Sequence, residues 1–309
     1  MDHLTFRFVN KQLTNWRAFI VEKYKQKIEL FFELKNSPES TRESMKSRIK
    51  DFIIYVEAVL EIDIEIITFE DIQGYILHLK RDRDLSPGTI NNYISSIKFF
   101  YTYVLEKTWN PIKVPRMRRV RSFPVIPPRE QVYAVLDGTD NLKHKAILAL
   151  IYGSGLRISE VARLRICDID SQTMRVRVEG AKHNTNRYTI LSETSLLILR
   201  KYFKAYHHRS YSKNDWLFPG DRKENPVTVR TIQKVFLKIR KRLNMDTKIS
   251  AHTLRHCFAT HFLEDGVEPV HIQHMLGHKK LETTNAYLHM TSKSLMGIKS
   301  PLDKYRGKD

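Results

Sequence analysis

Cysteine is scarce in this sequence, which has only Cys167 and Cys257 among its 309 residues. Two cysteines cannot build a disulfide framework, and neither lies in a metal-type cysteine pair, so a disulfide scaffold and a cysteine-based zinc site are excluded. No run of about 18 apolar residues occurs, and Met1 to Asn15 lack the apolar segment of a signal peptide. We therefore expect two buried thiols in a reducing cytoplasm and no membrane partner.

Acidic side chains are too few to balance the basic ones. The sequence has 53 Lys and Arg against 34 Asp and Glu, a formal net charge of +19 and a pI near 9.8. Such an excess favours a polyanionic partner, because basic side chains release the counterions condensed on the polyanion. Since 41% of the residues are hydrophobic and the chain is long enough for two domains, we expect a globular protein that binds nucleic acid.

The first 110 residues carry helical patterns only. Thr68 with Asp71 is typical of a capping box, and Ser86 with Pro87 is typical of a helix start. We predict a four-helix domain over residues 1–110, with helices over residues 16–34, 40–60, 68–79 and 86–104.

Polar side chains follow the predicted exposed face of the last of these helices. They are Asn91, Asn92, Ser95, Ser96 and Lys98. Side chains of these types contact phosphates and base edges in protein–DNA complexes, so the face is a candidate DNA-contact surface. A solvated face without a partner explains the same residues.

The composition changes at residue 111. Prolines and basic residues then alternate: Pro111, Lys113, Pro115, Arg116, Arg118, Arg119, Arg121, Pro124, Pro127 and Pro128. Prolines keep a segment extended, and a row of cations would follow a phosphate backbone. We therefore predict a basic linker over residues 111–128 that contacts nucleic acid, and a second domain over residues 129–309.

The second domain mixes helices and strands. Residues 174–179 and 187–191 alternate as two strands around a turn that contains Lys182. Before them, a Gly-Ser-Gly break delivers Arg157 to the start of a helix, where a fixed cation beside backbone N–H groups could receive a phosphate oxygen. An arginine at such a position is otherwise an ordinary surface residue. Further helices are expected over residues 128–136, 141–152, 192–207 and 227–243.

The stretch from His252 to Tyr287 carries the remaining candidates. On a helix, His252 and Arg255 share one face, while Leu254 points to the opposite, core side. His278 follows a glycine that can close the preceding helix. Cationic and proton-bearing groups thus point at one spot, which suits a phosphate more than a metal.

The histidines of this stretch also raise the possibility of zinc. Zinc peptidases require His-Glu-x-x-His, but residue 253 is Thr, and no third ligand has a suitable spacing. His256 and His261 are expected to fill or border the core, and His271 and His274 to lie on a partly solvated helix. We therefore predict no metal and no other cofactor.

Five motifs in this order and spacing are similar to those of the tyrosine recombinase (phage integrase) family, and most similar to its compact Xer-type members. They are Gly155-Leu156-Arg157-Ile158-Ser159-Glu160, Lys182 in the hairpin turn, His252-x-x-Arg255-His256, Leu276-Gly277-His278 and Tyr287. The resemblance covers nearly the whole chain. It implies a mainly α fold with a small β-sheet, in which an N-terminal four-helix, SAM-like core-binding domain precedes an α+β catalytic domain.

The resemblance also implies roles for the matching residues. Tyr287 would attack a DNA phosphodiester to give a 3′-phosphotyrosine link and a free 5′-hydroxyl. Arg157 and Arg255 would clamp the two non-bridging oxygens, and Glu160 would support Arg157 from behind. Two Arg forks can stabilise the charge of phosphoryl transfer without a metal, and a covalent link keeps the energy of the broken bond, so rejoining can need no ATP.

The proton-transfer roles fall on three further residues. By the resemblance, Lys182 would protonate the leaving 5′-oxygen, His252 would act as the acid and base on the tyrosine side, and His278 would donate to the scissile phosphate. The hairpin departs from the common Gly-Lys-Gly form by Ala181 and His183, although Lys182 is the only lysine in the turn.

Three functions remain open. The first is a site-specific recombinase that acts as a tetramer on paired half-sites in duplex DNA, alone or with a second recombinase, for integration and excision of a mobile element or for resolution of chromosome dimers. The second is a type IB topoisomerase-like enzyme, and the third is a non-catalytic DNA-binding relative. The helical first domain favours the site-specific recombinase, and we expect the protein in the bacterial or archaeal cytoplasm, associated with the nucleoid. The apolar tail, which by the resemblance docks on a neighbouring protomer and contains Leu295, Met296, Ile298 and Leu302, also favours the recombinase.

Overall fold

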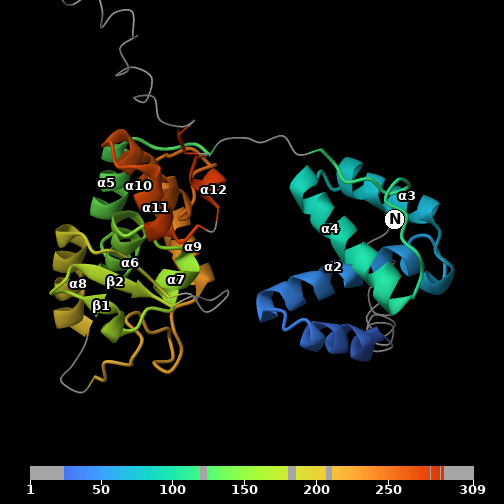
Figure 1. Cartoon of the computed structure of the whole chain (residues 1–309), viewed down its shortest axis with the longest axis horizontal. Helices are drawn as coiled ribbons and strands as arrows, with labels where there is room; N and C mark the ends of the chain where they lie inside the picture. Colours follow the sequence, from blue (N-terminus) through green and yellow to red (C-terminus); the bar gives the residue numbers. More distant parts are fainter. Residues whose placement is uncertain are drawn as a thin grey trace, which may run out of the picture. The chain divides into compact units, whose positions relative to one another are not determined.

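The computed structural model describes residues 24–118, 124–179, 186–206, 211–278, 280–285 and 287–288. The chain separates into two compact units, Met1–Arg121 and Ser122–Asp309, and Figure 1 labels most of their helices and two of the strands. No helix among the described residues is long and apolar enough to cross a membrane.

The described elements of the first unit are all helical. Residues 24–34 are followed by α2 (Glu39–Ala58), the 3-10 turn η1 (Ile64–Ile66), α3 (Phe69–Arg81), α4 (Pro87–Phe99) and the π-helical η2 (Phe100–Val104). Thr68 and Asp71 form the predicted capping box at the start of α3. Ser86 caps α4, and Pro87 opens its first turn. Both predicted helix starts are confirmed.

The polar face predicted for α4 is only partly exposed. Asn92 and Lys98 are exposed, but Asn91 and Ser96 are buried. The Asn91 amide donates to the Met117 carbonyl and accepts from the Met117 N–H, each at 2.9 Å. The prediction of Asn91 and Ser96 as exposed contacts is therefore wrong. A periodic pattern shows which residues are polar, but not which later segment of the chain covers them.

Arg116 from the predicted linker also binds this helix. Its guanidinium donates to the Ser95 hydroxyl and to the Asn91 carbonyl. Arg116 and Arg118 are both exposed, whereas Arg119 and Arg121 lie outside the described residues. The start of the predicted linker is thus anchored on α4.

The second unit combines helices with a small sheet. Its elements are α5 (Arg129–Asp137), α6 (Leu142–Gly153), α7 (Ile158–Ala162), η3 (Ile166–Asp168), β1 (Ile169–Asp170), β2 (Arg175–Val178), β3 (Arg187–Ile190), α8 (Glu193–Tyr206), α9 (Val229–Arg242), α10 (Thr253–Glu264), α11 (Pro269–Leu276) and α12 (Leu281–Asn285). The strands form an antiparallel sheet in the order β1-β2-β3, in which Val176 pairs with Thr189. The predicted fold class, mainly α with a small β-sheet, is confirmed.

The helix α6 forms the centre of this unit. Its residues from Ala146 to Ile151 are all buried, as expected of a helix that is apolar on every side, and it contacts α7, α8 and α10. After α6 the chain turns at Gly155, whose φ is 62°. An added Cβ there would lie 2.6 Å from the ring of Phe258. This close approach brings the start of α7, with Arg157, against α10.

The two cysteines differ in exposure. Cys257 lies on α10 and is buried, as predicted. Cys167 lies in the single turn η3 and is exposed, so the prediction of a second buried thiol is wrong. A short connecting turn runs over the surface, so a side chain such as that of Cys167 can lie in solvent.

Candidate active site

Arg157 occupies the N-cap position of α7. Its backbone N–H donates to Oε2 of Glu160 at 2.7 Å, and its guanidinium donates to Oε1 of the same carboxylate at 2.8 Å. The side chain remains 40% exposed. An arginine fork that a carboxylate holds on one side and solvent reaches on the other can receive an anion.

Glu160 holds two further arginines. Arg187 on β3 donates to both carboxylate oxygens, at 2.9 and 2.7 Å, and Arg255 lies 3.5 Å from Oε2. Burial raises the pKa of Glu160, but the hydrogen bonds and charge of Arg187, with the Arg157 N–H and the charge of Arg255, outweigh it and lower the pKa to about 2. A single ionised carboxylate thus lies within ion-pair distance of three guanidinium groups.

Arg255 on α10 is almost completely buried, with 2% of its surface exposed. It donates to the carbonyls of Gly155 (2.6 Å) and Leu276 (2.7 Å), and its Nη2 lies 3.3 Å from Nε2 of His278. Burial and the charge of Arg157 lower its pKa to about 9, so it stays charged at neutral pH. The prediction that Arg255 shares an open face with His252 is only partly correct, because its long side chain turns inward to two backbone carbonyls.

His278 follows α11, which Gly277 closes in the left-handed conformation. Its Nδ1 lies 2.9 Å from the hydroxyl of Thr284, and its Nε2 faces the Arg255 guanidinium. Burial, followed by the charge of Arg255, lowers the pKa of His278 to about 4. Since an arginine can only donate, Nε2 accepts and the proton of the neutral ring sits on Nδ1.

Tyr287 follows α12 and is 5% exposed. Its hydroxyl lies 2.9 Å from Nδ1 of His256, and its ring stacks with His278 at a centroid distance of 6.3 Å. Burial raises the pKa of Tyr287, while the charges of Arg255 and Arg157 act in the opposite direction. The hydroxyl therefore lies between a histidine and the arginine cluster.

His252 is the N-cap residue of α10 and is exposed. Its ring packs at right angles against the ring of His256, with centroids 4.8 Å apart. Desolvation by the surrounding protein lowers its pKa, and the charges of Arg255 and Arg157 add to this effect. Five of the six predicted catalytic residues are thus brought together, while Lys182 lies outside the described residues.

Sequence reasoning missed two residues of this cluster. Arg187 joins Glu160 to the Met275 carbonyl, to which it donates at 2.9 Å. The available signal was an arginine at the first position of a strand, directly after the hairpin turn. His256 was expected to border the core, and it does, but it also binds the Tyr287 hydroxyl. Its position beside Arg255 in the sequence was the available signal.

The described residues contain no group of three or more His, Cys, Asp or Glu side chains that could hold a metal ion. His256 and His261 of α10 face the hydroxyls of Tyr287 and Tyr152, and His278, after α11, faces Arg255. Fixed positive charge at this site comes from Arg157, Arg187 and Arg255, and one carboxylate forms an ion pair with each of them. Such an arrangement is suited to binding and stabilising a phosphoryl group.

A small sheet with helices around it, an arginine cluster and a buried tyrosine define a tyrosine recombinase catalytic unit. Residues 129–294 match the phage integrase family, and residues 24–111 match the phage integrase N-terminal SAM-like domain. The chain therefore belongs to the phage integrase family, and as a tyrosine recombinase it is an enzyme of DNA recombination.

Its relatives include y4eF of Sinorhizobium fredii, named as an integrase/recombinase, which is 37% identical over 235 residues, 76% of this chain and 92% of that protein. Tyrosine recombinase XerA of Pyrococcus horikoshii is 32% identical over 74% of this chain and 78% of its own length. Among solved structures, XerH bound to its difH substrate has a TM-score of 0.66 at 18% identity and covers 85% of this chain and 79% of that one. The Tn1549 transposon integrase in complex with transposon right end DNA has a TM-score of 0.65 at 19% identity and covers 91% of this chain and 96% of that one.

Proposed function

We propose that this enzyme cuts and rejoins DNA at specific sites through a 3′-phosphotyrosine intermediate, with Tyr287 as the nucleophile. The observation that carries the proposal is the environment of the Tyr287 hydroxyl, which binds a histidine and lies in the field of Arg255 and Arg157. A phenol with a pKa of about 10 is a weak nucleophile at neutral pH unless a base and positive charge lie close by. A histidine and two positively charged arginines lie close to the Tyr287 hydroxyl.

The scissile phosphate would bind to Arg157 and Arg255. Arg157 keeps part of its fork open to solvent, and two backbone carbonyls hold Arg255 in place. Because Arg157 already presents open donors and Arg255 has only to exchange His278 for the phosphate, both would stabilise the charge that develops on the non-bridging oxygens. Lys182 would protonate the leaving 5′-oxygen. His278 would add a hydrogen bond once its Nε2 exchanges Arg255 for the phosphate and carries the proton.

Duplex DNA with paired half-sites is the proposed substrate, contacted by both domains and by the linker over residues 111–128. The net charge of +19 supports this choice. In the first domain, the exposed candidates for contact with the phosphate backbone are Asn92, Lys98, Arg116 and Arg118. Ser95 binds Arg116, so its contribution would be to orient that cation.

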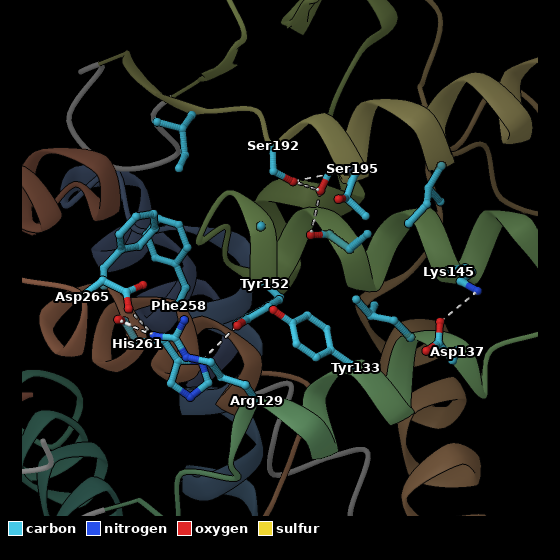
Figure 2. Close-up of a pocket in the computed structure, with 17 residues that line it drawn as sticks. Arg129, Tyr133, Asp137, Lys145, Tyr152, Ser192, Ser195, Phe258, His261 and Asp265 are labelled. Carbon is cyan, nitrogen blue, oxygen red and sulfur yellow. Dashed lines mark hydrogen bonds and ion pairs between the residues drawn. The ribbon is translucent and has the colours of Figure 1, made fainter. Parts of the chain in front are cut away.

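We also propose that four copies assemble on two sites. The second unit has a cavity of about 320 Å³ with largely aromatic and aliphatic walls, which include Tyr133, Tyr152 and Phe258. Figure 2 shows these rings beside the ion pair between Arg129 and Asp265, whose atoms are 2.7 Å apart. Such walls suit an apolar segment, and the tail after Thr291 contains four large apolar residues, Leu295, Met296, Ile298 and Leu302. Docking of this tail in the cavity of a neighbouring copy would join the protomers.

The proposed biological role is integration and excision of a mobile element or resolution of chromosome dimers, in the cytoplasm at the chromosome. A topoisomerase-like enzyme would use the same cleavage chemistry as a monomer. The apolar tail and its matching cavity favour the recombinase. If deletion of the tail abolishes recombination but leaves single-site cleavage intact, assembly through the tail is supported, and equal loss of both would contradict it.

The nucleophile is tested with a DNA suicide substrate, from which the short fragment that carries the free 5′-hydroxyl diffuses away after cleavage. The wild-type chain should form a protein–DNA adduct that survives denaturation. Tyr287→Phe should bind the DNA with similar affinity but form no adduct, and Tyr188→Phe, at an exposed tyrosine of β3, should behave as wild type. An adduct in Tyr287→Phe would refute the assignment.

A further inference from the structure

The hydrogen-bond partner of the candidate nucleophile is His256. Its Nδ1 lies 2.9 Å from the Tyr287 hydroxyl, a distance suited to direct proton transfer. No hydrogen bond between His252 and Tyr287 occurs in the described part of the site, although the family resemblance assigns the acid–base role to His252. We infer that His256 is the catalytic base that takes the proton of Tyr287, an inference that rests on the proposed function.

The charge state of the imidazole allows the tyrosine hydroxyl to donate this hydrogen bond. Burial lowers the pKa of His256 to about 4, with further lowering by His252 and Arg255, so the ring is neutral at pH 7. A neutral imidazole has one nitrogen that accepts and one that donates. With the tyrosine hydroxyl as donor, Nδ1 accepts and Nε2 carries the ring proton. The nucleophile then faces a lone pair before the substrate arrives.

The charges around the pair explain why the base becomes effective only with DNA bound. The charged and titratable groups around it are Arg157 and Glu160 at the start of α7, Arg187 on β3, His252 and Arg255 at the start of α10, and His278 beyond Gly277. With three arginines against one carboxylate, positive charge dominates and opposes a second proton on His256. A phosphodiester held by two of these arginines adds negative charge and raises the pKa of His256. Substrate binding thereby turns a neutral acceptor into a stronger base.

The step balances without a further reactant. The hydroxyl proton of Tyr287 moves to Nδ1 of His256 as the bond from its oxygen to phosphorus forms and the bond from phosphorus to the 5′-oxygen breaks. The 5′-oxygen leaves with a proton from Lys182. On rejoining, the attacking 5′-hydroxyl returns a proton to Lys182, and the tyrosine recovers its own from His256.

His256→Asn tests this role, because asparagine keeps a polar group near the Nδ1 position but cannot take up a proton at neutral pH. The rate of adduct formation on the suicide substrate should fall about 100-fold at pH 7. It should then rise about tenfold per pH unit up to pH 9, because the phenol must ionise by itself. The wild-type rate should instead level off once His256 is deprotonated. The matched variant His252→Asn should retain this levelling, whatever its absolute rate.

The results distinguish a failure of the His256 assignment from a failure of the proposed function. If His256→Asn keeps both the wild-type rate and the levelling, His256 is not the base, and loss of the levelling in His252→Asn alone would return the role to His252. If the wild-type chain forms no adduct at all, the proposed function itself fails. Unfolding temperature and DNA affinity check that the variant is folded. If it is not, His256→Gly supplies the second test, since added imidazole should restore adduct formation, and a failure to do so would contradict the inference.

Discussion

Substitution of Glu160 tests most directly how the arginines of the candidate site are held together. Its carboxylate binds Arg157 and Arg187 directly and lies 3.5 Å from Arg255, and only 10% of its side chain is exposed. Replacing it by glutamine keeps the size and the hydrogen-bonding shape but removes the charge. Three guanidinium groups would then lie close together with no counter-ion between them, and we expect the second unit to be destabilised.

The magnitude follows from the pKa of Glu160. A fall of the Glu160 pKa from its ordinary value of 4.5 to about 2 stabilises the folded unit by about 3 kcal/mol, at about 1.36 kcal/mol per pKa unit. This agrees with the cost of about 3–5 kcal/mol for removing one partner of a buried ion pair. For a unit of this size, Glu160→Gln should lower the unfolding temperature by about 6–12 °C at pH 7.

The pH dependence of stability follows from the direction of the Glu160 pKa shift. Because the folded-state pKa is depressed, the stabilisation is fully present above pH 4.5 and is lost as the pH falls toward about 2. The gap in unfolding temperature between wild type and Glu160→Gln should therefore close over this window in differential scanning calorimetry. Glu224→Gln, at an exposed carboxylate, should change stability by no more than about 0.5 kcal/mol. A Glu160→Gln variant within 1 °C of wild type at pH 7 would refute the counter-ion reasoning.

Three further predictions concern other parts of the chain. Gly155→Ala should destabilise the second unit by about 2 kcal/mol in denaturant unfolding, because the residue has φ of 62° and its added Cβ would meet an aromatic ring at 2.6 Å; unchanged stability would contradict the close approach. Asn91→Ala should lower the free energy of unfolding of the first unit by about 1–3 kcal/mol, because the two hydrogen bonds to Met117 are lost, whereas Asn92→Ala should be nearly neutral. Equal effects of the two substitutions on unfolding would argue against anchoring of Met117 by Asn91. Lys182→Ala should lose adduct formation on ordinary DNA and regain it on a substrate with a 5′-bridging sulfur, because a thiolate leaves without protonation; failure of this rescue with intact binding would show that Lys182 is not the acid.

The sequence predicted the elements of the fold well where local chemistry decides them. The capping box of Thr68 and the Ser86–Pro87 start lie where the pattern placed them, because a cap depends only on residues three or four positions apart. The strand β1 was not predicted. It has two residues, Ile169 and Asp170, and pairs with β2 only after the chain has folded back.

The exposure of single polar residues was less predictable. Asn91 was assigned to a DNA-contact face, but it is buried beneath the chain around Met117. Polarity is a property of the residue, whereas burial depends on segments that are distant in the sequence. The same reason explains the inward turn of Arg255, whose two carbonyl partners belong to Gly155 and Leu276.

The sequence by itself determined the membership in a chemical family: motif order and spacing pointed to Arg157, Arg255, His278 and Tyr287 as one phosphate-facing set. Only the tertiary structure decided how these groups are paired. It showed that Glu160 holds Arg187 as well as Arg157, and that the tyrosine hydroxyl binds His256 and not His252. Sequence motifs show which residues are present at fixed intervals along the chain. The hydrogen bonds between α7, β3, α10 and the residues after α12 depend instead on tertiary packing. Close packing at Gly155 and Gly277 brings these elements within a few ångströms of one another.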